Sequence, residues 1–152
     1  MPVIQSKFLG EISCDPGSEL YLPAGLPGFE DLRWLLPVEI PAHRPLVFLQ
    51  SSRNPDVCLV CLPASSIEPG YRAEITEDDR ALLELDSDRE LIMGEDILCL
   101  ALLLPAGDTV RTNLEAPIVI NLRNYKCAQV ISEGAPGFSR RLSADGRWET
   151  SC

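Results

Sequence analysis

Short apolar segments separated by turn residues follow one another along most of the chain. Residues 71–75 alternate between apolar and polar side chains, which is typical of a strand with one buried face. Residues 46–50, 57–62 and 97–104 are instead continuously apolar, which indicates strands covered on both faces. The pattern predicts about ten short strands, at residues 7–14, 19–22, 33–38, 46–51, 57–62, 71–75, 97–104, 110–114, 118–121 and 128–132.

Only one segment has a firm helical signature, and it lies near residues 77–85. Thr76 can cap its N-terminus, and Asp79 occupies the capping-box position three residues later. The acidic residues of the first turn suit the positive end of the helix dipole. Because one short helix cannot supply the crossovers of a parallel sheet, we expect an all-β, mostly antiparallel fold in a compact barrel-like or sandwich arrangement.

The length and composition fit one folded unit. The chain has 152 residues, of which 45% are hydrophobic and 24% charged, enough for a core without disulfides or metals. The sequence contains no internal repeat or linker, so residues 1–142 are predicted to form a single β domain. The polar residues 143–152 are predicted to be a frayed C-terminal tail, with Trp148 as the one residue able to dock.

Acidic residues dominate the charge and are concentrated in one part of the chain. The 13 basic and 23 acidic residues give a net charge of -10, which argues against direct binding to nucleic acid. Residues 74–96 hold ten of the acids and only two basic residues. This stretch is either a solvated helix and loop or a surface that docks a basic partner. For a docking surface, the candidate contacts are Glu74, Glu77, Asp78 and Asp79.

The chain lacks the signals of export and membrane insertion. Its N-terminus has no signal-peptide pattern, and its longest apolar run, residues 97–104, is too short to span a bilayer. We therefore expect a cytoplasmic protein without membrane contact, in which disulfides are disfavoured. Cys58 and Cys61 form a CxxC pair, but within a strand their side chains point to opposite faces. With His43 as the only histidine, core cysteines and no metal site are expected.

The sequence offers no convincing catalytic centre or cofactor site. His43 lies between prolines in a loop, where a histidine is more often solvated than a general base. The glycine-rich motifs that cradle phosphates are absent. The acidic stretch also lacks the apolar surroundings that raise the pKa of a carboxyl group. We expect a non-enzymatic binding protein without catalytic residues, cofactors or metal.

Three sequence blocks stand out by their turn and strand-end chemistry. GLPGFE at residues 25–30 predicts a compact turn that is pinned by Phe29 and has Gly28 at positive φ. FLQS at residues 48–51 ends an apolar strand with an amide side chain. TNLEAPIVIN at residues 112–121 places a proline at the start of a strand, where its missing N–H does no harm.

The order and spacing of these blocks, with FLGEI at residues 8–12, resemble the bacterial flagellar assembly factor FliW over residues 7–142. The resemblance implies a non-enzymatic, barrel-like β protein that binds cytoplasmic flagellin and, alternatively, the RNA-binding translational regulator CsrA. Export of flagellin then frees the protein to antagonise CsrA and to relieve the repression of flagellin synthesis. Besides the acidic stretch, our candidate partner contacts are the strand-end residues Gln50, Asn54 and Asp56.

Two other functions stay open from the sequence. A small-ligand-binding β-barrel would enclose a polar-lined cavity and retain a small molecule. An unrecognised enzyme would depend on His43 and would lose its activity when that residue is replaced by alanine. The sequence does not indicate which surface binds which partner, or whether two binding sites overlap.

Overall fold

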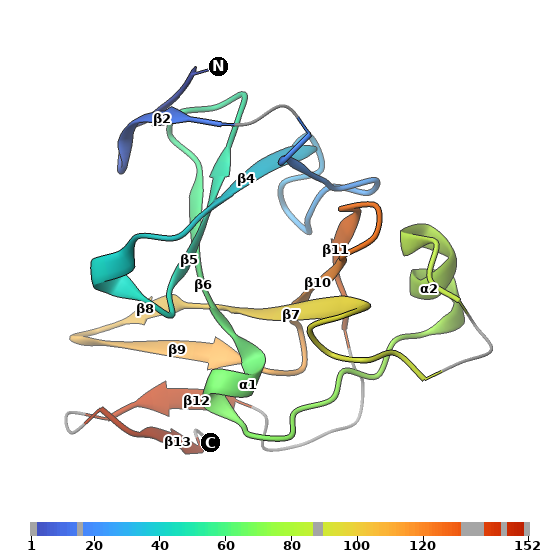
Figure 1. Ribbon diagram of the computed structural model, residues 1–152. Helices are drawn as coiled ribbons and strands as arrows, with labels where there is room; N and C mark the ends of the chain where they lie inside the picture. The colour runs from blue at the N-terminus through green and yellow to red at the C-terminus, as the bar shows by residue number, and fades with distance from the viewer. Residues whose placement is uncertain (1–2, 15–16, 87–89, 132–138, 144–145, 151–152) are drawn as a thin grey trace.

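A seven-stranded antiparallel sheet forms the centre of the molecule (Figure 1). The computed structural model describes residues 3–14, 17–86, 90–131, 139–143 and 146–150. The strands of the central sheet lie in the order β11-β10-β7-β6-β5-β4-β3. Their bounds are Leu20–Tyr21 for β3, Trp34–Val38 for β4, Val47–Ser51 for β5, Cys58–Pro63 for β6, Ile97–Leu102 for β7, Ile118–Asn121 for β10 and Cys127–Gln129 for β11.

The two edges of this sheet meet. Tyr21 of β3 pairs with Lys126 beside β11, and the Tyr21 backbone N–H donates to the Tyr125 carbonyl at 2.9 Å. This contact joins the first and last strands of the sheet and nearly closes a barrel. The predicted all-β, mostly antiparallel, barrel-like fold is confirmed.

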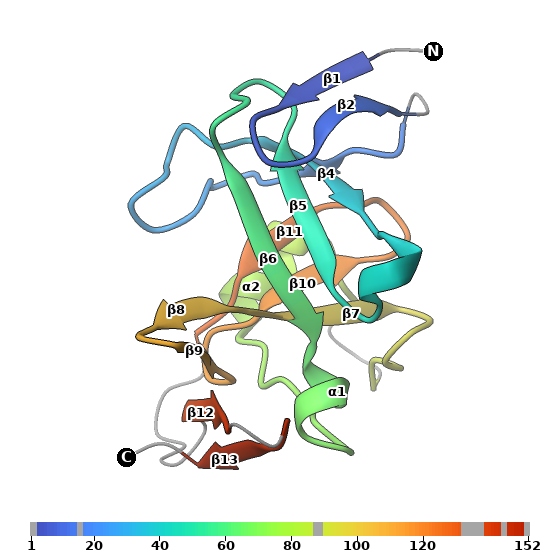
Figure 2. The ribbon, with the colours of Figure 1, turned by 90° about the vertical axis from the view of Figure 1, so that its left-hand side faces the viewer.

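Two smaller sheets lie at opposite ends of the barrel (Figure 2). The N-terminal hairpin pairs β1 (Val3–Ser6) with β2 (Gly10–Ser13). The strand predicted at residues 7–14 is therefore only the second half of a hairpin. The other sheet has the order β13-β12-β9-β8, with bounds Leu104–Ala106 for β8, Thr109–Asn113 for β9, Ser139–Leu142 for β12 and Trp148–Thr150 for β13.

The central strands bury both of their faces, as their continuous apolar runs predicted. Leu100 and Ile118 point into a core inside the barrel, whereas their neighbours Cys99 and Val119 belong to a second core outside it. Side chains alternate across a strand, so each of these strands supplies both cores. The inner core also contains the fully buried Leu22, Leu35 and Leu49.

The predicted helix near residues 77–85 is α2, Glu77–Leu83. The Thr76 hydroxyl accepts the backbone N–H of Asp79 at 3.2 Å, so the helix begins at the expected N-cap. It ends at Glu84, whose φ of 58° is left-handed. A single helical turn, α1 (Ala64–Ile67), and a 3₁₀ turn at Pro41–His43 were not predicted. In the described chain, every helix is too short or too polar to cross a membrane.

The strand predicted at residues 71–75 is wrong, because this segment is irregular. Tyr71 is buried in the second core, and its hydroxyl donates to the Leu114 carbonyl at 2.6 Å. Ala73 and Ile75 pack against the same core. An extended segment that lies flat on a core alternates buried and exposed side chains without any strand partner, which explains the misleading pattern.

The frayed tail predicted at residues 143–152 is also wrong in its described part. Residues 148–150 form β13, which pairs with β12 from Leu142↔Trp148 to Arg140↔Thr150. Trp148 packs against the second core, so its docking supplies the apolar contact that the polar sequence around it lacks.

Candidate protein-binding surfaces

Gln50 is an internal brace of the fold. Its side chain is fully buried, accepts the Ser6 hydroxyl at 2.6 Å and donates to the carbonyls of Ser51 at 2.9 Å and Asn54 at 3.3 Å. These bonds fasten the N-terminal hairpin to the turn between β5 and β6. The prediction that Gln50 touches a partner is corrected, because a fully buried side chain offers no atom to one.

The β5–β6 turn holds Asn54 and Asp56 on the surface. The Ser51 hydroxyl accepts the backbone N–H groups of Asn54 at 3.0 Å and Arg53 at 3.3 Å, and the Asn54 side chain accepts the Asp56 N–H at 3.0 Å. Such local side-chain bonds shape turns rich in serine and asparagine. Asn54 and Asp56 are exposed, as a contact with a partner requires.

The GLPGFE block forms a rigid turn that presents Phe29 to solvent. The Phe29 N–H donates to the Leu26 carbonyl at 2.7 Å, and Gly28 has a φ of +83°, as a type II turn with Pro27 before glycine demands. Gly28 at positive φ is therefore confirmed. The prediction that Phe29 anchors the turn by packing is wrong. Leu26 is the buried residue, whereas Phe29 is 52% exposed.

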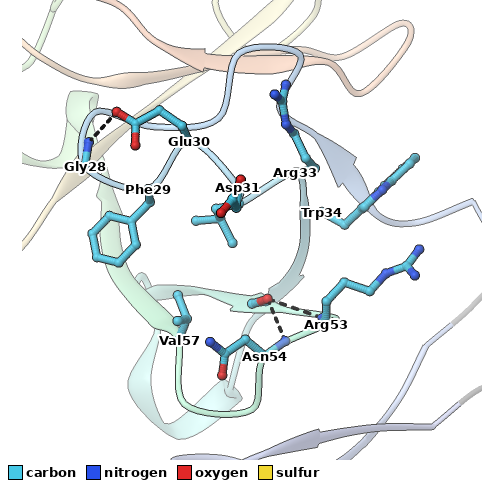
Figure 3. Close-up of a pocket in the computed structure, with 11 residues that line it drawn as sticks. Gly28, Phe29, Glu30, Asp31, Arg33, Trp34, Arg53, Asn54 and Val57 are labelled. Carbon is cyan, nitrogen blue, oxygen red and sulfur yellow. Dashed lines mark hydrogen bonds between the residues drawn. The ribbon is translucent and has the colours of Figure 1, made fainter.

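These two turns border a groove of about 550 Å³, which we call the aromatic groove (Figure 3). Phe29 and Val57 lie on one side, and Trp34 and Arg53 lie on the other. The Trp34 ring packs against Tyr21 with ring centroids 4.8 Å apart, which fixes this wall. The full lining is Gly28, Phe29, Glu30, Asp31, Leu32, Arg33, Trp34, Ser51, Arg53, Asn54 and Val57.

The acidic stretch forms a separate surface around α2, which we call the acidic surface. Asp79 is half-buried at the helix start, and Asp88 lies outside the described residues. Asp96 is buried, where it accepts the Ile92 N–H at 2.8 Å and pairs with Arg123 at 3.3 Å, so it supports the fold. The exposed acids are Glu74, Glu77, Asp78, Glu84, Asp86, Glu90 and Glu95.

The barrel holds the C-terminal end of α2 in place. The Asn121 amide donates to the Leu83 carbonyl at 2.8 Å, and the Asn124 amide donates to the same carbonyl at 3.3 Å. Lys126 forms an ion pair with Glu84 just beyond the helix. Sequence reasoning missed these positioning residues, although Asn121 closes the TNLEAPIVIN block and thus gave a signal.

A shallow groove of about 480 Å³ runs beside the acidic surface. Its apolar lining includes Ile75, Met93 and Ile92, which is 50% exposed. The exposed ion pair of Arg72 and Glu90, at 2.8 Å, stands at its rim. An apolar centre with a charged rim is the usual anatomy of a protein-binding surface.

Cys61, Cys99 and Cys127 are buried in the two cores, where their thiols stay protonated. Cys61 faces the inner core, and Cys58 lies on the opposite side of β6. Burial raises the pKa of Cys61 to about 12, with a smaller contribution from Cys58, and burial alone raises the pKa values of Cys99 and Cys127 to about 12. Metal ligation uses thiolates, so this environment opposes it. Within the described ranges, no group of three or more His, Cys, Asp or Glu residues is arranged to hold a metal ion.

Comparison with known proteins points to one family. A family model described as FliW protein matches residues 3–142. The flagellar assembly factor FliW of Geotalea uraniireducens is 30% identical over 136 residues, which are 88% of this chain and 78% of the relative. The flagellar assembly factor FliW of Syntrophomonas wolfei is 32% identical over 130 residues, or 85% and 80% of the two chains. That of Bacillus velezensis is 29% identical over 144 residues, or 95% and 98%.

A solved structure has the same architecture. A crystal structure of the flagellar assembly factor FliW superposes with a TM-score of 0.76 at 22% sequence identity. The match covers 99% of this chain and 95% of that chain. At this identity the likeness concerns the fold, and it extends over the barrel and both smaller sheets.

Proposed function

The chain belongs to the FliW family of flagellar assembly factors, and on this premise we propose that it acts by binding the translational regulator CsrA and flagellin in alternation. The motifs that the chain shares with the family suggest these two partners. The acidic surface is the observation that carries the proposal, because it offers a cationic partner a concentrated negative field on a fixed helix.

The charge of each partner fits this role. A regulator that binds RNA must present positive surface to the phosphates, and an acidic protein can dock beside that surface. Its field would then also disfavour the phosphates of the RNA. Flagellin that accumulates before export would occupy the protein and leave CsrA active, whereas export would release the protein to bind CsrA. Both partners meet it in the cytoplasm under this proposal.

The surroundings of His43 and the packing inside the barrel support a binding function rather than a catalytic one. His43 is exposed on a 3₁₀ turn and lines neither the aromatic groove nor the shallow groove beside the acidic surface. Leu35, Leu49 and Leu100 fill the interior of the barrel together with the rest of the inner core. This packing favours recognition of proteins on the outside over a ligand cavity on the inside.

Charge reversal tests the role of the acidic surface. The triple variant Glu74→Lys, Glu77→Lys and Asp78→Lys replaces exposed acids, and we expect it to bind purified CsrA at least about tenfold more weakly at low salt. The dependence of its affinity on salt concentration should also be flatter. Isothermal titration calorimetry at two salt concentrations measures both effects.

A matched control changes the net charge equally at other sites. Glu11→Lys, Asp108→Lys and Glu149→Lys replace exposed acids outside both surfaces, and this variant should keep most of the affinity for CsrA. Circular dichroism would verify that α2 survives lysine at its N-terminal end, where a positive charge is unfavourable. Equal loss of affinity in the two triple variants would refute a localised acidic surface.

A further inference from the structure

The N-terminal hairpin is a separate small layer on one end of the barrel. Among the described residues, β1 and β2 form a two-stranded sheet and pair only with each other. Figure 2 shows this hairpin lying across the end of the barrel where β5 turns into β6. Three of the four residues of β2 are exposed. Because a two-stranded hairpin is marginally stable by itself in water, its position depends on its contacts with the barrel.

The apolar contact between the hairpin and the barrel is small. It is a third core, which consists of the buried Ile4, Cys14 and Leu36 with Ile12 and Val38 at its border. In the described part of the chain, the inner core and the second core contain twelve buried residues each. Apolar stabilisation grows with the area that is removed from water, so the third core holds its element less strongly than the two large cores hold theirs.

Two hydrogen bonds fasten the hairpin to the β5–β6 turn. The Ser6 hydroxyl donates to the Gln50 side chain at 2.6 Å, and the Lys7 backbone N–H donates to the Pro55 carbonyl at 2.9 Å. Both donors belong to the same hairpin that forms the third core. These contacts are therefore lost together when the hairpin lifts off, as in the cooperative local openings of folded proteins.

The base of the β5–β6 turn is held by the barrel instead. The Ser52 hydroxyl donates to Glu19 at 2.6 Å, and the Ser52 backbone N–H donates to the Trp34 carbonyl at 3.3 Å. Beyond this base, the turn borders the aromatic groove (Figure 3) with Arg53, Asn54 and Val57. The hairpin thus supports the part of the turn that shapes the groove, whereas the base of the turn stays attached without it.

We propose that the N-terminal hairpin is a strap that opens as a unit on the folded barrel, and that its closure holds the β5–β6 border of the aromatic groove in place. In the closed strap, Ser6 and Lys7 keep the turn in position. In the open strap these bonds are broken, while the bonds of Ser52 at the base remain. The shape of the groove is then adjustable without any disturbance of the two large cores.

Alkylation by iodoacetamide tests the opening of the strap. Cys14 is 6% exposed in the third core and reacts only when the strap opens, whereas Cys61, Cys99 and Cys127 lie in the two large cores. Each rate is measured by peptide mass spectrometry and divided by the rate of the same cysteine in the unfolded chain. Cys14 should then react at least about tenfold faster than the other three, and its rate should rise only weakly with urea. A Cys14 rate as slow as theirs, with the same dependence on urea, would overturn the proposal.

Two serine variants test the contact that closes the strap. Ser6→Ala removes the hydrogen bond to Gln50, and we expect Cys14 to be alkylated about fivefold faster while the cysteines of the large cores change less than about twofold. Ser13→Ala is the matched control, because it makes the same change at an exposed position of the same hairpin. It should alter the Cys14 rate by less than about twofold. Equal acceleration in the two variants would contradict closure through Ser6.

Hydrogen exchange measured by NMR tests the link between the strap and the groove. The Val57 N–H donates to the Asn54 carbonyl across the turn at 3.2 Å, and in Ser6→Ala it should exchange faster by the same factor as Cys14 is alkylated. The Phe29 N–H, in the GLPGFE turn at the other border of the groove, should exchange as in the wild type. Unchanged exchange at Val57, or equal acceleration at Phe29, would overturn the link to the groove.

Discussion

At the scale of single residues, burial separates the polar groups that hold the fold from those that can meet a partner. Gln50 near the end of β5 and Asn54 in the turn that follows both carry amide side chains, yet the first is fully buried and the second is exposed. The difference arises because the N-terminal hairpin covers Gln50 and supplies the Ser6 hydroxyl to it. Ser6 and Gln50 are 44 residues apart in the sequence, so the residues around Gln50 do not predict this hydrogen bond.

Replacement of Gln50 should reveal its structural role. Gln50→Leu removes three hydrogen bonds and leaves the Ser6 hydroxyl and two carbonyls without this partner. We expect the free energy of unfolding to fall by about 1–3 kcal/mol, measured by urea denaturation. Gln5→Leu, at an exposed position in β1, is the control and should change it by less than about 0.5 kcal/mol. An equal loss of stability in the two variants would contradict a structural role for the Gln50 hydrogen bonds.

At the scale of elements, turn and cap chemistry was predictable, and long-range packing was not. The capping pattern from Thr76 to Asp79 located α2, and the LPGF sequence indicated a turn with Gly28 at positive φ. The strand predicted at residues 71–75 failed because alternation reports which side chains are buried and says nothing of a hydrogen-bonded neighbour. Trp148 stabilises β13 by packing against the second core, and the polar residues around it in the sequence gave no sign of a strand.

The glycines of the GLPGFE turn should differ in their tolerance of a side chain. Gly25 has a φ of +66°, and a Cβ atom there would lie 2.5 Å from the Glu30 carbonyl oxygen. Gly28 has a φ of +83°, but a Cβ atom there would meet nothing within 4 Å. Gly28→Ala should therefore lose about 1 kcal/mol of stability from the left-handed backbone alone.

Gly25→Ala should lose clearly more than Gly28→Ala, because the backbone of the turn must also shift. Thermal unfolding followed by circular dichroism gives the comparison. Similar stability of the two alanine variants would show that the close approach at Gly25 is unimportant.

At the scale of the whole molecule, the barrel is a rigid support for two unlike surfaces. The sequence indicated the acidic surface, because a run of charges that dense is incompatible with burial, and its acids are mostly exposed. It did not indicate the aromatic groove, whose walls come from residues 28–34 and 51–57. The pairing of β4 with β5, at Leu35↔Ser51, brings these segments together.

The placement of α2 also belongs to this scale. Asn121 at the end of β10 and Asn124 in the following turn hold the last carbonyl of the helix, and the buried Leu83 packs it onto the second core, so its acids have a fixed position. That turn contacts the other surface through Tyr21. The acidic surface and the aromatic groove are therefore neighbours on one barrel, linked through Trp34, Tyr21 and Lys126.

Displacement of RNA from CsrA is the most direct measurement of antagonism by this protein. A fluorescently labelled RNA with a CsrA-binding site is first saturated with CsrA, and the protein is then titrated while anisotropy is recorded. Anisotropy should fall to the value of free RNA and should rise again when flagellin monomer is added. Anisotropy that stays at the bound value under saturating protein would contradict CsrA antagonism, and a fall that flagellin does not reverse would contradict alternation between the two partners.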